Sequence, residues 1–103
     1  MNQFTKQTNE KFYIYGGITD VIPTDDTIVI GLCSVTVLDN ADVDVTTTIV
    51  DSSTLAVYDT TKVKVLLKAA GTEALSPYKI TFTIGTSSLE SYEVDIFMTI
   101  DNI

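Results

Sequence analysis

The sequence contains no histidine, no arginine and no tryptophan, and its one cysteine is Cys33. Histidine is the commonest general base and the side chain that ordinarily titrates near neutral pH, so its absence argues against most hydrolase mechanisms. We therefore expect no catalytic residues and no cofactor. A lone cysteine cannot form an internal disulfide, and without a histidine to deprotonate it we expect a buried, inert thiol in a strand.

Positive charge is also scarce. The formal net charge is −8, and the six basic residues are all lysines, scattered from Lys6 to Lys79. Nucleic-acid binding requires a clustered positive surface, and base readout relies on arginine, so we expect no nucleic-acid partner. The same argument disfavours an anionic membrane surface, and neither an export signal nor an apolar run of about 20 residues is visible. We expect synthesis in the cytoplasm.

The residues that are present predict one packed β domain. The chain has 103 residues, of which 45% are hydrophobic and 19% charged, which suits a single core and argues against disorder. From Phe12 onward, short apolar alternations are separated by Gly, Pro, Asp, Asn and Ser clusters, and no segment has the pattern of a helix. The first ten residues are polar. We therefore expect a flexible arm over residues 1–10 and a single domain over residues 11–103.

The clearest strands are residues 78–84 and 92–100, joined by a short polar turn at residues 85–89. Both alternate with a period of two, which predicts an antiparallel hairpin with one buried face. Residues 62–68 alternate valine and leucine with lysines, which would face water or lie at a sheet edge. In residues 27–37 the alternation changes phase near Gly31, which predicts a bulge or bend.

Weaker patterns bring the total to seven or eight short strands. This number, with turns at regular spacing, predicts an all-β, immunoglobulin-like antiparallel sandwich. Tyr78 begins the penultimate strand, where such sandwiches often place a tyrosine whose hydroxyl bonds back to nearby backbone; a simple core aromatic is the alternative. The weaker strands are residues 12–15, 18–22, 43–50 and 54–58, the last two separated by a turn at residues 51–53.

Acidic residues offer two candidate sites. Asp39, Asp42 and Asp44 could supply oxygen ligands to calcium, but they lack the spacing of an EF-hand, so a solvated turn is the favoured interpretation and we expect no metal. Asp25 and Asp26 are adjacent, and adjacent residues of a strand point to opposite faces, which argues for a turn over a pair of catalytic carboxylates.

Aromatic residues are the candidates for an interface. Strand alternation places Phe97 among Glu93, Asp95 and Thr99, on the outward face of its strand. Tyr13 and Tyr15 share one phase of the first strand, which points either inward or outward. Exposed aromatics on a rigid face are typical anchors of protein interfaces, so Phe97, Tyr13 and Tyr15 are our interface candidates.

Several segments carry a family resemblance. They are Asp26-Thr27-Ile28, Ser34-Val35-Thr36-Val37, residues 63–72 with their small-residue turn, residues 78–84, and residues 92–100. In order and spacing these segments resemble the small immunoglobulin-like structural proteins of tailed bacteriophages and prophages, including those described as fibre-tail adaptors. The chain departs from that pattern in having no tryptophan in the early strands, no arginine in the last hairpin, and Ala-Ala-Gly where Ser-Gly-Gly is common, which leaves the subtype open.

The resemblance implies a virion structural protein of the tail, neck or fibre-attachment region, present in several copies and contacting other virion structural proteins. It carries over no catalytic residue. The alternative is a surface adhesion or carbohydrate-binding sandwich, whose tyrosine and phenylalanine rings would stack on sugars. That alternative is weaker because the chain lacks tryptophan and an export signal.

Overall fold

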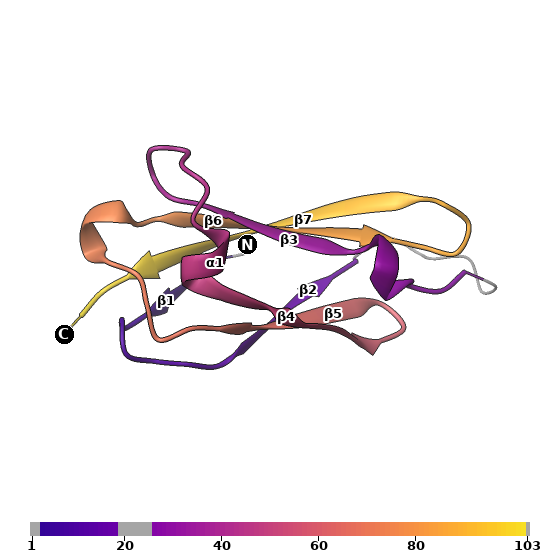
Figure 1. Ribbon diagram of the computed structural model, residues 1–103, viewed down its shortest axis with the longest axis horizontal. Coiled ribbons are helices and arrows are strands. Elements are labelled where there is room, and N and C mark those ends of the chain that lie inside the picture. Colours follow the sequence, from indigo (N-terminus) through magenta and orange to yellow (C-terminus); the bar gives the residue numbers. More distant parts are fainter. Residues whose placement is uncertain (1–2, 19–25, 103) are drawn as a thin grey trace.

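The described residues of the computed structural model, 3–18 and 26–102, form two sheets that lie face to face (Figure 1). The four-stranded sheet has the order β1-β7-β6-β3, and the three-stranded sheet has the order β2-β5-β4. The expected sandwich-like architecture is therefore confirmed for a mostly β protein. The strands are β1 (Gln3–Lys6), β2 (Tyr13–Gly17), β3 (Ser34–Leu38), β4 (Val50–Asp59), β5 (Lys62–Leu67), β6 (Tyr78–Gly85) and β7 (Ser91–Ile100).

The expected hairpin is confirmed: β6 and β7 pair antiparallel from Tyr78 opposite Met98 to Gly85 opposite Ser91. The expected strand at residues 62–68 is also confirmed as β5, although it lies in the middle of its sheet, so its lysines face water and do not mark an edge. The inward-facing side chains of the two sheets meet between them. The most deeply buried apolar residues are Val37, Ile49, Val50, Val63, Val65, Leu67, Tyr78, Ile80, Phe82, Ile84 and Met98.

One strand pair departs from the expected antiparallel arrangement. Residues 3–6, expected to belong to a flexible arm, form β1 and pair in parallel with β7, which makes the four-stranded sheet mixed. Lys6 ends β1 and is 1% exposed. Its ammonium group donates hydrogen bonds to the carbonyl oxygens of Gln7, Thr8 and Ala70 at 2.9, 3.1 and 3.1 Å. These three acceptors satisfy the buried ammonium group. The sequence does not reveal that Lys6 is buried, because it lies in a polar segment.

The prediction of a strand over residues 43–50 is wrong, because a one-turn helix, α1 (Thr46–Ile49), occupies half of this segment. The Asp44 carboxylate accepts hydrogen bonds from the backbone N–H and the hydroxyl of Thr46 at 2.9 and 2.6 Å. The Thr46 hydroxyl oxygen also accepts the Val37 N–H at 2.9 Å. Such side-chain bonds replace ladder bonds of a sheet, so the threonine-rich run turns instead of extending.

The prediction of one bent strand over residues 27–37 is wrong in detail. A 3₁₀ turn, η1 (Ile30–Leu32), interrupts the segment before β3 begins. Gly31 lies in η1 and is exposed, and a Cβ atom there would meet nothing within 4 Å. The close approach is at Gly85, where a Cβ atom would lie 2.7 Å from the carbonyl oxygen of Leu32. Val35 and Val37 are buried as the second phase predicts, whereas Ile30 and Leu32 of the first phase are exposed.

The turn expected at residues 51–53 is instead an irregularity inside β4. The pairing of β4 with β5 shifts register between Asp51 and Ala56. Asp51 accepts the N–H and hydroxyl of Ser53, and the Thr54 hydroxyl oxygen accepts the Leu66 N–H at 2.8 Å in place of a backbone carbonyl. The expected strand at residues 12–15 corresponds to β2, which continues through both glycines. The strand expected at residues 18–22 lies, apart from Ile18, outside the described residues.

Candidate functional site: the outer faces of the two sheets

The outer face of the three-stranded sheet carries exposed tyrosines. Tyr13 and Tyr15 flank the buried Ile14 in β2, so both point away from the core, with exposed fractions of 40% and 45%. Tyr58 of β4 is 55% exposed and lies against Tyr15. Register places Lys64 opposite Tyr15 and Lys62 opposite Gly17, on the same side of the sheet. We name this surface, made of Tyr13, Tyr15, Tyr58, Lys62 and Lys64, the tyrosine–lysine face.

The rings and ammonium groups of this face contact one another. The Tyr15 and Tyr58 ring centroids are 4.7 Å apart at an interplanar angle of 64°, an edge-to-face pair. The Lys64 ammonium lies 4.6 Å from the Tyr13 ring centroid, a cation–π contact. Beside the tyrosine pair is a shallow concavity of about 300 Å³, lined by Tyr15, Gly17, Tyr58 and Lys62. The face is thus an ordered, partly hollow aromatic surface.

Among residues 3–18 and 26–102, no carboxylate forms a direct ion pair with the lysines of this face. The ion pair formed by the described residues joins Lys79 to Asp95, on the other sheet. Asp59 lies near Lys62 at the edge of the face. The Thr61 N–H, the Thr61 hydroxyl and the Lys62 charge lower the pKa of the Asp59 carboxyl group, in that order of effect. On a chain of net charge −8, the tyrosine–lysine face is therefore a local region of opposite charge.

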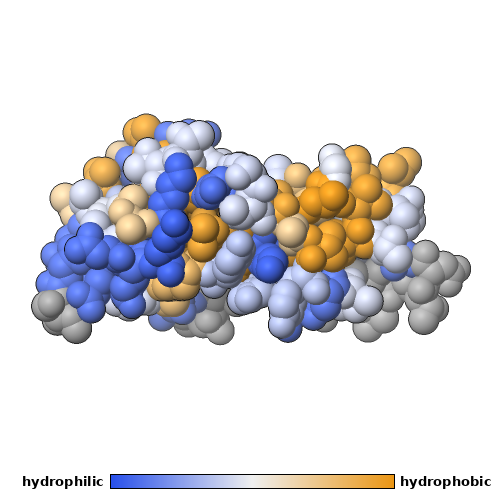
Figure 2. All heavy atoms as spheres, turned by 60° about the horizontal axis from the view of Figure 1, so that its bottom comes forward, coloured by the Kyte–Doolittle hydropathy of each residue, from blue (hydrophilic) through white to orange (hydrophobic). Residues whose placement is uncertain are grey.

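Apolar side chains gather at one end of the same side of the molecule. Figure 2 turns the three-stranded sheet towards the viewer and shows a compact hydrophobic area over the right half and hydrophilic residues over much of the left. Val57 of β4 and Ile30 and Leu32 of η1, which packs against β4, are exposed. Val57 directly precedes Tyr58 in β4 and pairs with the buried Val63.

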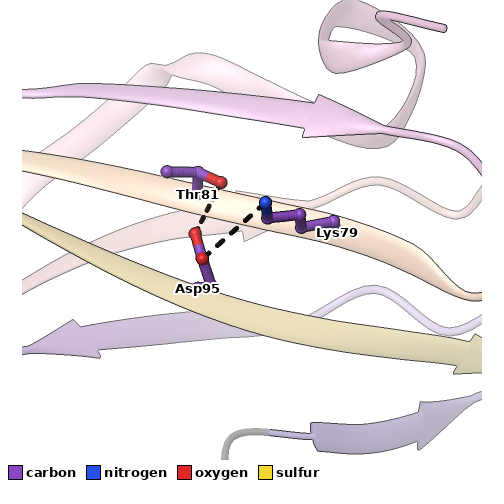
Figure 3. Close-up of polar contacts among 3 residues, drawn as sticks. All are labelled: Lys79, Thr81 and Asp95. Atoms are coloured by element: carbon purple, nitrogen blue, oxygen red, sulfur yellow. Dashed lines mark hydrogen bonds and ion pairs between the residues drawn. The ribbon is translucent and has the colours of Figure 1, made fainter. Parts of the chain in front are cut away.

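The outer face of the four-stranded sheet has a different chemistry. Thr81 and Thr83 point outward from β6, and Glu93, Asp95 and Phe97 point outward from β7. The Asp95 carboxylate accepts the Thr81 hydroxyl at 2.8 Å and lies 3.8 Å from the Lys79 ammonium (Figure 3). Phe97 is 43% exposed. We name this surface, made of Thr81, Thr83, Glu93, Asp95 and Phe97, the threonine–carboxylate face.

The three predicted interface residues are therefore all exposed but do not form one site. Tyr13 and Tyr15 lie on the tyrosine–lysine face, whereas Phe97 lies on the opposite side of the molecule. Tyr58 was not among the predicted residues. The register of β4 shifts between Val57 and Asp59, so simple alternation does not reveal which way Tyr58 points.

The acidic residues near β3 are held within their own loop. Asp39 is buried, and its carboxylate accepts the N–H groups of Ala41 and Val43 at 2.8 and 3.1 Å. The Thr46 hydroxyl and N–H lower the pKa of Asp44. Asp42 is exposed, with a positive φ of 61°. Across residues 3–18 and 26–102, no three histidine, cysteine, aspartate or glutamate side chains are placed to hold a metal ion together.

Asp26 fastens the start of the η1 segment to the turn between β6 and β7. Its carboxylate accepts the Ser87 hydroxyl at 2.8 Å, and the Ser88 hydroxyl and N–H at 2.6 and 3.0 Å. These bonds, the Ser88 hydroxyl first, lower the pKa of Asp26. Asp25 lies outside the described residues. The serines of this turn are thus hydrogen-bond donors that hold the hairpin tip in place.

Tyr78 combines the two roles considered for it. It is 1% exposed in the core, and its hydroxyl oxygen accepts the Thr72 N–H at 3.0 Å. Gly71, between β5 and β6, has a φ of 107°, and a Cβ atom there would lie 3.0 Å from the Ile100 side chain. The hydrogen bond therefore fixes a tight crossing between the two sheets.

A comparison with protein-family models and with curated proteins finds no match for the chain. Within the part of the chain that the structure describes, no helix is long and apolar enough to cross a membrane.

Proposed function

We propose that the chain is a non-enzymatic, immunoglobulin-like module of a tailed-bacteriophage virion, acting through protein–protein contacts in the tail, neck or fibre-attachment region. Its partners are other virion structural proteins, and it is made in the cytoplasm of the bacterial host. The family resemblance of the sequence supports the assignment to a virion. The surfaces described above support the mode of action.

The strand order supports an immunoglobulin-like topology. The order β2-β5-β4 corresponds to strands B, E and D of such sandwiches, and β3-β6-β7 corresponds to C, F and G. The difference is that β1 lies beside β7 instead of beside β2. Tyr78 at the start of β6 occupies the place of the tyrosine corner and makes its backbone hydrogen bond, to Thr72.

The observation that carries the proposal is the exposure of Tyr13, Tyr15 and Tyr58 on a rigid sheet. Tyrosine is enriched at protein interfaces because it buries a large ring at little entropic cost and still forms hydrogen bonds through its hydroxyl. An apolar area lies on the same side of the molecule. An aromatic and aliphatic patch of this kind on a small domain is typical of a surface that binds another protein.

Cross-linking mass spectrometry of intact particles tests the proposal. We expect the chain among the particle proteins, with cross-links from Lys62 and Lys64 to neighbouring structural proteins. Lys11, outside the tyrosine–lysine face, is the control position and should give fewer cross-links. Recovery of the chain only from host cytosol, and never from purified particles, would contradict the proposal.

A second candidate function, carbohydrate binding, is favoured by one observation. The concavity beside the Tyr15–Tyr58 pair has about the size of a small-ligand site, and aromatic rings are suited to stack on sugars. Glycan-array binding that is lost in Tyr15→Ala and Tyr58→Ala but kept in Phe97→Ala would favour this function. Absence of glycan binding by the wild-type chain would exclude it for the glycans tested.

A further inference from the structure

One outer face carries lysines and a concavity, and the other carries carboxylates and the exposed Phe97 ring. We propose that the tyrosine–lysine face of one copy packs against the threonine–carboxylate face of a second copy, so that copies of this chain associate head to tail. This inference rests on the proposed function, because it names the partner of the tyrosine–lysine face. It requires a partner surface with carboxylates and an exposed apolar anchor, and the chain itself supplies such a surface.

The charges of the two faces favour this contact. Two chains of net charge −8 repel each other over most of their surfaces. Lys62 and Lys64 take no part in the ion pair formed by the described residues, and neither does Glu93 on the opposite face. Packing the two faces together brings the Lys62 and Lys64 ammonium groups beside the Glu93 and Asp95 carboxylates. Contact through these faces therefore meets less repulsion than contact through any two acidic surfaces.

The shapes of the two faces also favour this contact. Phe97 projects from the middle of β7 as an exposed ring, and the concavity of about 300 Å³ lies on the other outer face. Interface anchors are typically aromatic side chains that fill pockets of the partner. With Phe97 seated in the concavity beside the Tyr15–Tyr58 pair, Asp95, two residues away in β7, lies close to Lys62 of the second copy. The aromatic contact and the charge contact are thus made by one arrangement.

The cross-strand neighbour of Phe97 is compatible with this packing. Lys79 lies opposite Phe97 in the β6–β7 ladder and would approach the lysines of the second copy. It is already paired with Asp95, and Asp59 lies at the edge of the receiving face. Lys79 therefore has Asp95 of its own chain on one side of the contact and Asp59 of the second copy on the other.

The inferred contact joins two different patches, so each copy keeps one unused face after the first contact. Such a heterologous interface continues into a ring if the rotation closes, or into a filament if it does not. The molecule measures 46 × 21 × 21 Å, so one of its long faces suffices for a standard interface, which buries about 800 Å² per partner.

Complementation of two broken faces tests the inference by sedimentation velocity. Tyr15→Ser/Lys62→Glu breaks the tyrosine–lysine face, and Glu93→Lys/Phe97→Ser breaks the threonine–carboxylate face. We expect wild type to form species larger than a dimer, each variant alone to be monomeric, and an equimolar mixture to give discrete dimers through the two intact faces. Lys11→Glu, with the charge change of Lys62→Glu at a position outside both faces, should associate like wild type.

Three results would overturn the inference: a monomeric wild type at millimolar concentration, a mixture that stays monomeric although both variants are folded by circular dichroism, or variants that associate like wild type. A monomeric chain that is nevertheless found in intact particles overturns self-association and leaves the proposed function standing. Self-association of a chain that is absent from particles overturns the proposed function and leaves the contact between copies standing.

Discussion

Replacing Lys6 with methionine should detach the first strand from the sheet. Lys6 is buried at the end of β1, where its ammonium donates to three backbone carbonyls, including that of Ala70 at a sequence separation of 64 residues. Methionine retains most of the apolar stem and removes every donor. The substitution therefore isolates the hydrogen bonds from the packing of the side chain.

The size of the effect follows from these bonds. A hydrogen bond to a charged group contributes about 1.5 to 3 kcal/mol, and three are lost. Two effects reduce the total. Burial lowers the pKa of Lys6 despite the opposing charge of Glu10, which reflects a desolvation cost that methionine avoids, and the freed carbonyl groups regain some contact with water. We expect a net loss of about 2 to 3 kcal/mol in the free energy of unfolding.

Urea unfolding and native-state hydrogen exchange measure this loss. For a domain of this size, the expected loss lowers Tm by roughly 10 to 20 °C. Exchange should accelerate most in β1 and in the β7 residues that pair with it. Lys11→Met, at an exposed lysine outside the strands, should change stability by less than about 0.5 kcal/mol. Equal stability of the two variants, with unchanged protection in β1, would refute the role assigned to Lys6.

Further predictions concern three other contacts. Tyr78→Phe should lower the free energy of unfolding by about 1 kcal/mol in calorimetry, because the ring stays buried but the Thr72 N–H loses its acceptor. An unchanged Tm would show that this hydrogen bond does not stabilise the protein. Gly85→Ala should destabilise by about 1 to 3 kcal/mol in urea, since its methyl group would overlap the Leu32 carbonyl; wild-type stability would show that η1 shifts freely. Because its pKa is lowered in the folded state, Asp26 stabilises the protein above about pH 4 and loses this effect on acidification. Asp26→Asn should therefore flatten the acid limb of a Tm-versus-pH curve, and an identical limb would contradict this.

The strands that the sequence predicts well are those whose pairing is local. β6 and β7 have unbroken alternation and a short connection, so their faces follow from period two alone. Alternation also predicts that Phe97 points outward. β5 follows for the same reason, since valine and leucine mark its inward side between lysines.

The elements that the sequence does not predict depend on side-chain to backbone bonds or on distant contacts. Thr46 has the propensity of a strand residue, but its bonds with Asp44 and Val37 favour a helical turn. β1 is held by Lys6 and by β7, at the other end of the chain. Neither interaction leaves a periodic pattern in the sequence.

The candidate site is predictable residue by residue but not as a surface. Exposure of Tyr13 and Tyr15 is one of two possibilities that alternation allows, and the structure selects it because Ile14 enters the core. That Phe97 lies on the opposite face follows only from the division of strands between the two sheets. Tyr58 joins the tyrosines through an irregular register, which propensity does not encode.

A cryo-electron microscopy reconstruction of an intact particle containing this chain tests most directly whether the outer faces of the sandwich are its working surfaces. We predict that the chain occupies a repeated position in the tail, neck or fibre-attachment region, with Tyr13, Tyr15 and Tyr58 buried against a neighbouring protein. A chain seated in the particle with both outer sheet faces open to solvent would contradict the account.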